Sequence, residues 1–298
     1  MTLGQAPLAR DLLASSIGRV AELADGDEPQ PDLIETAALA HAAYGAALRD
    51  LDQSVEAEEA LLVSRELFQK LPKDRLTPGV RRRAAVVVGQ LARISAESDQ
   101  LEEGLRLFRQ ADEELRTLIA DNDADAVSKD ALAALCRHWA DVLFAIDRRD
   151  EAAPLYRQAS SLWRDLPGEF DLHIGQLWLL LTCAEETVRD PTLAVTIAER
   201  LRARVPDNVR LLTLLSLAKA QLGDTDAAER FAKESRQLLA DGNTTAAFVL
   251  TLVEHQRGRK DDAAAAFDAA TQQMKKQHPA SWSAQRLREM VAKELGKD

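Results

Sequence analysis

The 298-residue sequence has few of the residues that sheets and loop-rich chains require. Aromatic residues make up 4% of the chain, which holds only 13 glycines and 10 prolines. β-Branched residues are also sparse, so there is little material for strands. Alanine (51 residues) and leucine (45 residues) dominate instead, and both favour helix. Because 46% of the residues are hydrophobic and 29% charged, the chain is not disordered, and we expect an all-α protein.

The two cysteines, Cys136 and Cys183, are too few for a disulfide framework. Both lie in apolar helical stretches, where we expect reduced core residues in a reducing compartment. No apolar run approaches the roughly 18 residues of a membrane span, and residues 1–10 lack the apolar core of a signal peptide. The sequence therefore predicts a cytoplasmic protein without a membrane partner.

Basic residues are fewer than acidic ones, and the net charge at pH 7 is -11. This balance argues against a nucleic-acid partner held by general electrostatics. The one basic cluster, residues 73–83, places Arg81, Arg82 and Arg83 in the first turn of a predicted helix, where the helix dipole disfavours cations. Two interpretations stay open: an acidic partner binds there, or the cluster is a solvated loop balanced by Asp74 and other acids.

Apolar residues recur at spacings of three and four between most of the prolines, as is typical of amphipathic helices. Thr77 directly precedes Pro78, which predicts an N-cap followed by the first helical turn. The short connections favour antiparallel pairs. After an opening helix at about residues 8–24, the predicted helical segments are residues 32–50, 53–71, 79–97, 100–120, 128–146, 149–165, 170–188, 191–205, 208–222, 225–240, 244–257, 260–276 and 279–296.

An internal repeat organises these segments. Ala228 follows the turn glycine Gly223 by five residues, and 35 residues after Gly223 the turn glycine Gly258 is followed by Ala263 at the same offset. A small residue late in the first helix and another early in the second let two backbones approach closely. A large residue four positions later fills the gap against the next hairpin. Each hairpin has two apolar faces, so we expect copies to stack into a solenoid.

These residues resemble the tetratricopeptide repeat, W-x2-L…A-x3-F-x2-A…P. The spacing is 34 or 35 residues in the last three copies and 42 to 48 in the first three, where Ser64 and Leu67 compete for one position. The resemblance implies one domain over residues 1–298, a right-handed superhelical solenoid of about six antiparallel hairpins over 32–276. A capping helix and an acidic loop precede it in 1–31, and a second capping helix follows it in 279–298. The matching residues are Trp178, Leu181, Ala194, Pro206, Ala228, Ala263, Phe267 and Ala270.

A second resemblance concerns the helical-repeat regions that follow the catalytic domain in large bacterial serine/threonine kinases. It rests on Leu8–Leu23, on Ala37–Leu51 and on the ending Ser283–Gly296. The sequence contains no kinase catalytic motif. This resemblance would make the chain a regulatory repeat segment, either free-standing or part of a longer protein.

No constellation of catalytic residues stands out, and we expect neither an enzyme nor a bound cofactor or metal. Phosphate-binding glycine motifs are absent. Residues 121–125 begin like a calcium loop, but Ala126 and Leu132 replace the glycine and glutamate such a loop requires; the alternative is a polar turn with N-cap carboxylates. Cys136 beside His138 suggests an activated thiolate or, more simply, a core cysteine, because neighbours one and two apart point to different helix faces.

The tetratricopeptide resemblance implies that the first helix of each hairpin lines a groove for a partner peptide or helix. We therefore expect a protein-interaction scaffold, with self-association open and an unrecognised enzyme as a further alternative. The clamp by which some members hold chaperone C-termini is missing, since its positions carry Ala43, Ala46, Gln90, Arg93, His138 and Asp141. The predicted groove residues are Gln90, Arg93, Arg137, His138, Asp141, Leu179, Cys183, Thr213, Leu217, Phe248 and Leu252.

Overall fold

The structure, a computed structural model, divides into two compact units. We call Gln5–Asp171 the N-terminal unit and Leu172–Asp298 the C-terminal unit, and describe each by itself. The prediction of a single domain over residues 1–298 stays a prediction. The described residues are 11–15, 17, 30–50, 53–98, 100–122, 125–166, 174–238, 243–276 and 282–297.

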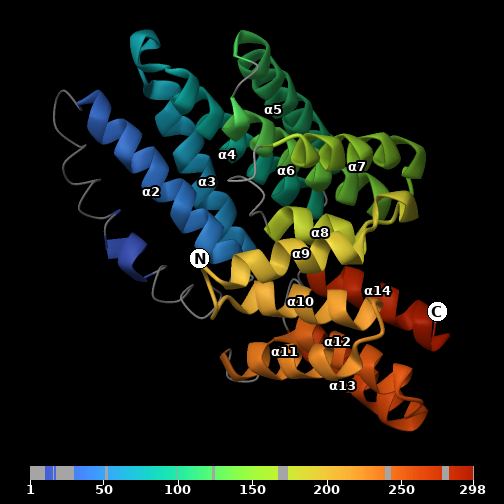
Figure 1. The fold of residues 1–298 in the computed structure, drawn as a ribbon. Helices are drawn as coiled ribbons and strands as arrows, with labels where there is room; N and C mark the ends of the chain where they lie inside the picture. Colours follow the sequence, from blue (N-terminus) through green and yellow to red (C-terminus); the bar gives the residue numbers. More distant parts are fainter. Residues whose placement is uncertain are drawn as a thin grey trace. The chain divides into compact units, whose positions relative to one another are not determined.

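Helices make up almost all of the described residues, and no strand occurs among them (Figure 1). The all-α prediction is confirmed. The N-terminal unit contains α2 (Pro31–Asp50), α3 (Ser54–Lys70), α4 (Pro78–Glu97), α5 (Leu101–Asp121), α6 (Ala126–Ala145) and α7 (Arg149–Arg164). The C-terminal unit contains α8 (Ile174–Thr182), α9 (Pro191–Arg202), α10 (Val209–Gln221), α11 (Thr225–Leu238), α12 (Thr244–Gln256), α13 (Lys260–Lys276) and α14 (Trp282–Leu295).

Small residues bring the helices of the N-terminal hairpins close together, as the repeat predicts. A Cβ atom on Gly45 of α2 would lie 2.8 Å from Leu61 Cγ of α3. In the next hairpin, a Cβ atom on Gly104 of α5 would lie 2.7 Å from the carbonyl oxygen of Ala92 in α4. Neither position has room for a side chain. The large residue Phe108 then stacks on Trp139 of the following hairpin, with ring centroids 5.8 Å apart.

Side-chain caps decide where several helices begin. Thr77 accepts a hydrogen bond from the Val80 N–H, and Pro78 occupies the first turn, which confirms the predicted start of α4. Asp125 accepts from the backbone N–H groups of Val127 and Ser128 at the start of α6. Asp190, Asn208 and Asn243 cap α9, α10 and α12 in the same way. Each cap satisfies an N–H group that has no partner within its helix.

The C-terminal unit has its own core, drawn from α8 to α14. Its first hairpin departs from the sequence prediction of one helix over 170–188, because α8 is only nine residues long and ends at Thr182. Residues 183–190 form a connection that includes the short 3-10 helix η3 (Glu186–Val188). In it, Asp190 N–H donates to the carbonyl oxygen of Leu180 and Arg189 Nε to that of Cys183. Asp190 must also be extended before Pro191, so the chain cannot continue α8 up to α9.

The terminal helices are described only in part. Residues 11–15 and 17 are helical; the rest of the predicted opening helix, and the predicted acidic loop before residue 30, lie outside the described residues. Helix α14 covers the last hairpin, as predicted, and Lys297 just beyond it donates to the carbonyl oxygen of Ala264 in α13 (3.3 Å). Helix α14 also contacts α8. Across the described residues, every helix is too short or too polar to cross a bilayer.

Candidate interaction surfaces

The first helices of the three N-terminal hairpins enclose a hollow of about 360 Å³. Its floor is mostly apolar, with residues such as Leu39 of α2, Val86 of α4 and Leu135 of α6. Four arginines and one aspartate also line it, so we call it the arginine-lined hollow. Three of the predicted groove residues lie in it: Gln90, Arg93 and His138. The charged lining residues are Arg49, Arg82, Arg83, Arg93 and Asp130.

The arginines on α4 are held by carboxylates of the same unit. Arg82 lies 3.8 Å from an Asp125 oxygen and Arg83 lies 2.9 Å from Glu35. Arg81, in the same turn but outside the hollow, pairs with Glu114 at 2.6 Å. The cations at this helix N-terminus are therefore balanced by acids from three neighbouring segments, which offsets the unfavourable helix dipole. This arrangement supports the balanced-loop interpretation for Arg81, while Arg82 and Arg83 also face the hollow.

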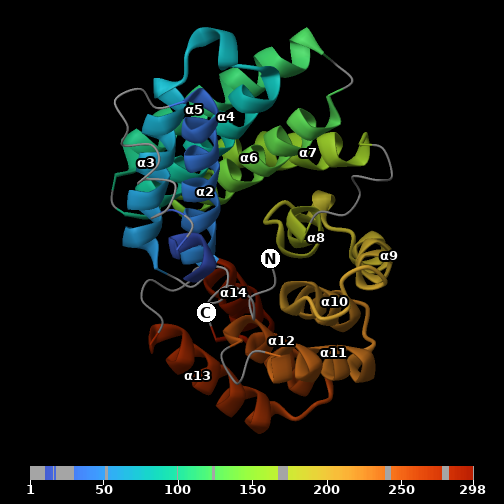
Figure 2. The ribbon, with the colours of Figure 1, turned by 90° about the vertical axis from the view of Figure 1, so that its left-hand side faces the viewer.

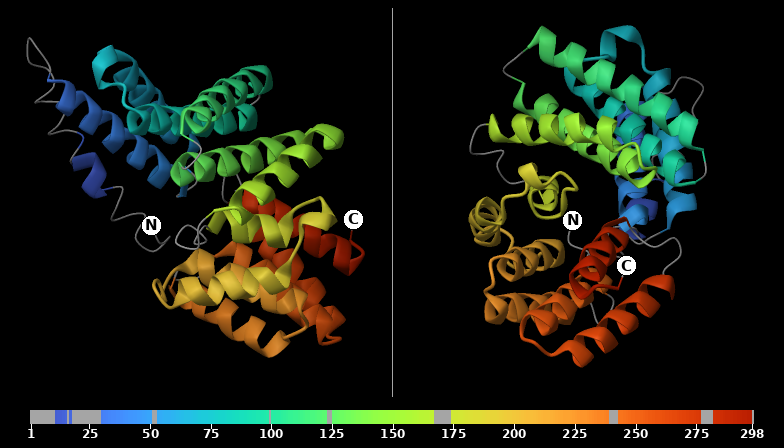
Figure 3. Two further views of the ribbon diagram at one scale, coloured as in Figure 1. Left: turned by 45° about the horizontal axis from the view of Figure 1, so that its top comes forward. Right: turned by 90° about the vertical axis from the view of Figure 1, so that its right-hand side faces the viewer.

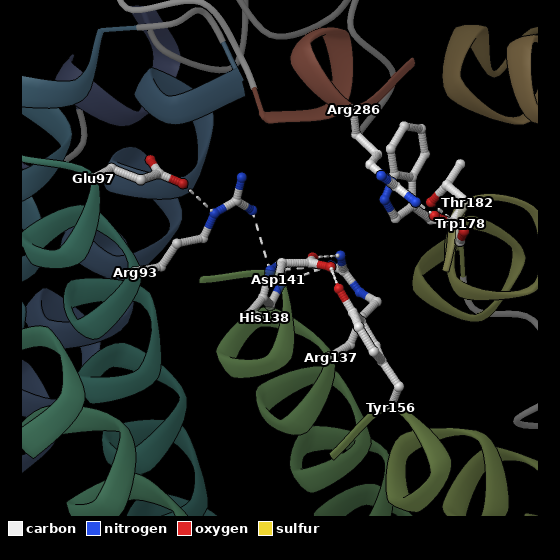
Figure 4. Close-up of polar contacts among 9 residues, drawn as sticks. All are labelled: Arg93, Glu97, Arg137, His138, Asp141, Tyr156, Trp178, Thr182 and Arg286. Atoms are coloured by element: carbon white, nitrogen blue, oxygen red, sulfur yellow. Dashed lines mark hydrogen bonds and ion pairs between the residues drawn. The ribbon is translucent and has the colours of Figure 1, made fainter. Parts of the chain in front are cut away.

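Arg93 and His138 form the polar end of the hollow (Figure 4). Arg93 Nε donates to Glu97 at 2.7 Å, and its Nη1 lies 3.2 Å from His138 Nδ1. The contact with His138 joins α4 to α6. Gln90 lies one turn earlier, with its buried Oε1 atom lacking a hydrogen-bond partner. The sequence placed these three residues on one surface, and the structure brings them together.

Arg137 and Asp141, in contrast, serve the packing of α6 against α7 (Figure 4). Arg137 is 9% exposed, and its Nη1 donates to Asp141 at 2.8 Å. The other oxygen of Asp141 accepts from the Tyr156 hydroxyl of α7, also at 2.8 Å. Arg137, although a predicted groove residue, is therefore not a free cation, because its charge is already neutralised within the hairpin. Neither Arg137 nor Asp141 lines the hollow.

The apolar half of the predicted groove is buried in the C-terminal unit. Because these side chains fill the spaces between helices, they offer no open surface to a partner. Thr213 also bonds internally, since it lies 2.8 Å from the Ser235 hydroxyl and accepts from Asn243 Nδ2 at 2.9 Å. The buried residues, with their exposed fractions, are Leu179 (1%), Cys183 (3%), Thr213 (4%), Leu217 (1%), Phe248 (0%) and Leu252 (8%).

Cys136 is a core residue rather than an activated thiolate. It is fully buried, and burial, reinforced by the nearby Asp112, raises the pKa of its thiol to about 12. A thiol with this pKa stays protonated at neutral pH and is a poor nucleophile. Among the described residues, no three His, Cys, Asp or Glu side chains are grouped to hold a metal ion. Asp125, in the segment that resembles a calcium loop, caps α6.

Several polar contacts were not predicted from the sequence, although each kind of contact occurs at two places along the chain. Ser64 donates to the carbonyl oxygen of Ala38 at 2.7 Å, and Ser235 to that of Val209 at 3.0 Å, in both cases 26 residues earlier. This places Ser64, not Leu67, in the small-residue position of the first hairpin. Two glutamines that end the first helices likewise bond to the preceding first helix: Gln221 to the carbonyl oxygen of Leu181 and Gln256 to that of Ala220.

The order and packing of the helices agree with the predicted repeat. Helix pairs follow one another in the order α2/α3, α4/α5, α6/α7 in one unit and α8/α9, α10/α11, α12/α13 in the other, with small residues where first and second helices approach. The hairpins are tetratricopeptide-like. The predicted number of about six hairpins is met by the described helices.

Several solved structures are similar to this chain. PilW, described as a widely conserved type IV pilus biogenesis factor, has 16% identity and a TM-score of 0.41 over 72% of this chain and 94% of its own. PilF of Pseudomonas aeruginosa has 16% identity and a TM-score of 0.39 over 87% of this chain and 99% of its own. Yeast Tom70 has 12% identity and a TM-score of 0.42 over 97% of this chain and 70% of its own. A scan against protein-family models gives no match, and neither does a search of curated proteins.

Proposed function

We propose that the protein is a non-catalytic interaction scaffold whose arginine-lined hollow binds a helical or extended segment of a partner protein. The observation that carries this proposal is the hollow itself, because apolar residues and four arginines line it together. Apolar side chains of a partner would supply most of the affinity there. Carboxylates of the partner would meet the arginines and set the orientation of the segment.

The dimensions of the hollow suit a short segment. Its volume of about 360 Å³ is at the lower end of the usual range for ligand pockets, about 300–1,000 Å³. The lining runs along α4 from Arg82 to Arg93, which are 11 residues apart. At about 1.5 Å per residue this is about 16 Å, or roughly three turns of a helix. A partner segment of about ten residues matches this length.

The internal ion pairs of the arginines leave them available for exchange. Arg83 has a side chain that is 45% exposed, and those of Arg82 and Arg93 are 21% and 18% exposed. The most exposed of these pairs, Arg83–Glu35, is of the kind that stabilises a protein by about 0–1 kcal/mol. A partner carboxylate can therefore replace Glu35 at little cost, which favours an acidic, apolar segment over a basic one. The kinase-segment alternative stays a prediction.

A peptide-display selection tests this proposal. The full chain is the bait, in parallel with Arg83→Glu/Arg93→Glu, and the library displays random 16-residue peptides. We expect the wild type to enrich sequences with leucine-like residues at helical spacing and with aspartate or glutamate. The double variant should lose them, with affinities for synthetic versions falling about tenfold or more because two attractive contacts become repulsive. Affinity is measured by fluorescence anisotropy.

The matched control is Arg109→Glu/Arg157→Glu, which makes the same charge change at exposed positions of the second helices α5 and α7. It should bind the selected peptides as the wild type does. Equal enrichment by all three baits, or peptides without acidic residues, would contradict the assignment to the hollow. Circular dichroism melts of each bait establish that the charge changes leave the helices folded.

A further inference from the structure

Helix α14 does not simply continue the stack of hairpins. In Figures 2 and 3 it lies on the side of α8, α10 and α12, away from α9 and α11. We call the surface formed by α8, α10 and α12 the first-helix face. The helix that precedes α14, α13, belongs to the last hairpin, so a plain capping helix needs to contact only α12 and α13. Contacts with α8, two hairpins earlier, require another explanation.

Polar contacts at both ends of α14 span the whole C-terminal unit. Near its start, Arg286 Nε donates to the carbonyl oxygen of Thr182 at 2.9 Å, as Figure 4 shows. Beyond its end, Lys297 Nζ lies 3.0 Å from Asp268 of α13. Thr182 is the last residue of the short α8, whose terminal carbonyl groups have no partner within the helix. Arg286 therefore supplies both a donor and a favourable cation at a helix C-terminus.

The apolar side chains of α14 share a core with residues that the sequence assigned to a groove. Ala284, Leu287, Val291 and Ala292 of α14 belong to one core cluster with Leu217, Phe248 and Leu252. Their spacing of i, i+3, i+7 and i+8 forms one stripe along a helix. The face that the sequence predicts for a partner helix is thus covered by a helix of the same chain.

We propose that α14 is an internal ligand of the first-helix face, and that the face also accepts a partner's amphipathic helix carrying the same stripe. The partner helix would have small or aliphatic residues at i, i+3, i+7 and i+8, and an arginine at i+2 to reach the end of α8. This inference concerns the C-terminal unit and does not depend on the arginine-lined hollow.

The contacts of α14 are few enough to be exchanged. Four of its described side chains are fully buried, against ten residues of α10. Arg286 is also paired with Glu289 of its own helix, 3.3 Å away, and Lys297 is exposed. Since the apolar stripe and Arg286 are all carried by α14 itself, a separate helix with the same residues can reproduce the contacts with α8 and with the core.

Hydrogen exchange on the full-length wild type is the first test. An internal ligand opens without the rest of the unit, so we expect amides of residues 284–295 to exchange at least about tenfold faster than those of α10 and α12. Equal protection in the three helices would overturn the inference, because α14 would then belong to the same cooperative unit as the core.

The second test uses a fluorescent synthetic peptide of residues 279–298 and the full chain. Leu287→Asp in the chain weakens the internal helix, so this variant should bind the peptide about tenfold more tightly than the wild type does. A peptide that itself carries Leu287→Asp should not bind. The control variant Lys293→Gln makes the same change in net charge at an exposed position of α14 and should behave as the wild type.

Three results of this second test would overturn the inference. The Leu287→Asp chain could stay helical and yet fail to bind the peptide. It could lose the cooperative unfolding of the C-terminal unit, which would make α14 an obligatory part of the core. Size-exclusion chromatography with light scattering could show that α14 is exchanged between two copies, which would replace the partner helix by a second copy of this chain.

Discussion

At the scale of single residues, Arg137 shows how one side-chain type serves two purposes. Its position on the first helix of a hairpin is equivalent to a groove position, and the sequence therefore assigned it to a partner. The tertiary structure uses it to connect Asp141 and, through that carboxylate, Tyr156 of α7. Arg93, at a comparable position of the preceding hairpin, faces the hollow instead. From sequence spacing, both arginines are expected on the groove-lining face of their helices. Only the packing of the helices shows that one is buried and the other faces the hollow.

The two arginines should therefore differ in what their removal costs. We expect Arg137→Ala to lower the free energy of unfolding by about 2–3 kcal/mol, because it leaves a partly buried aspartate without its cation. Arg93→Ala should cost less, about 1 kcal/mol, because the Arg93 side chain is partly exposed and reaches the hollow, where water can replace the lost contact. Urea unfolding followed by circular dichroism measures both. Similar losses in the two variants would contradict the division between a structural and a surface arginine.

At the scale of helices and hairpins, some helix ends can be predicted from the sequence and others cannot. The sequence predicts the start of α4 from Thr77 and Pro78, because capping is a local interaction. It does not predict that α8 ends at Thr182, since the hydrogen bonds around residues 183–190 are formed by groups of the connection itself and by α14. Asn208 and Asn243 cap two successive first helices, yet only Asn243 also bonds to Thr213 and Ser235.

This pair of caps gives a direct comparison. We expect Asn208→Ala to lower the free energy of unfolding by about 1 kcal/mol, the usual cost of a lost cap. Asn243→Ala should cost about 2 kcal/mol or more, because it also removes a donor from two buried hydroxyls. Urea unfolding of both variants is the measurement. A loss for Asn243→Ala no larger than that for Asn208→Ala would show that the buried hydrogen bonds add nothing to the cap.

The ion pairs between α11 and the turn after α12 make a contribution to stability that depends on pH. Glu229 contacts Lys233 at 2.5 Å and Arg257 at 2.6 Å, and hydrogen bonds to these two cations lower the pKa of its carboxyl to about 2. In the unfolded chain this pKa returns to about 4.3. The folded state is therefore stabilised by the ionised carboxylate above about pH 4.3, and this stabilisation is lost as the pH falls toward 2.

We accordingly expect Glu229→Gln to lower the melting temperature at pH 7 and to have less effect with each step below about pH 4. Near pH 2 the two melting temperatures should coincide. Differential scanning calorimetry from pH 7 to pH 2 is the measurement. Glu234→Gln is the control, because it removes a carboxylate of the same helix that pairs with one arginine at 3.2 Å. A Glu229 effect that grows toward low pH would contradict the assignment.

At the scale of the whole molecule, the repeat relates positions that no local pattern connects. The serine bonds of Ser64 and Ser235 occur at the same 26-residue separation in the two units, so the first and fifth hairpins are built alike despite their different spacing in the sequence. In a solenoid each hairpin is stabilised by its neighbours, and such repeated contacts add along the stack. The two surfaces proposed for partners both lie on first helices, one in each unit.

The sequence alone determined the helical class, the six hairpins and the small residues between them, because helix periodicity and close packing are set by local spacing. It also placed Gln90, Arg93 and His138 on one surface. Which first-helix residues face a hollow, which are buried, and where α14 lies were decided only by the tertiary structure. The reason is that accessibility depends on what covers a face, and here the covering helix, α14, comes from about 100 residues further along the chain than the α8 carbonyl it contacts.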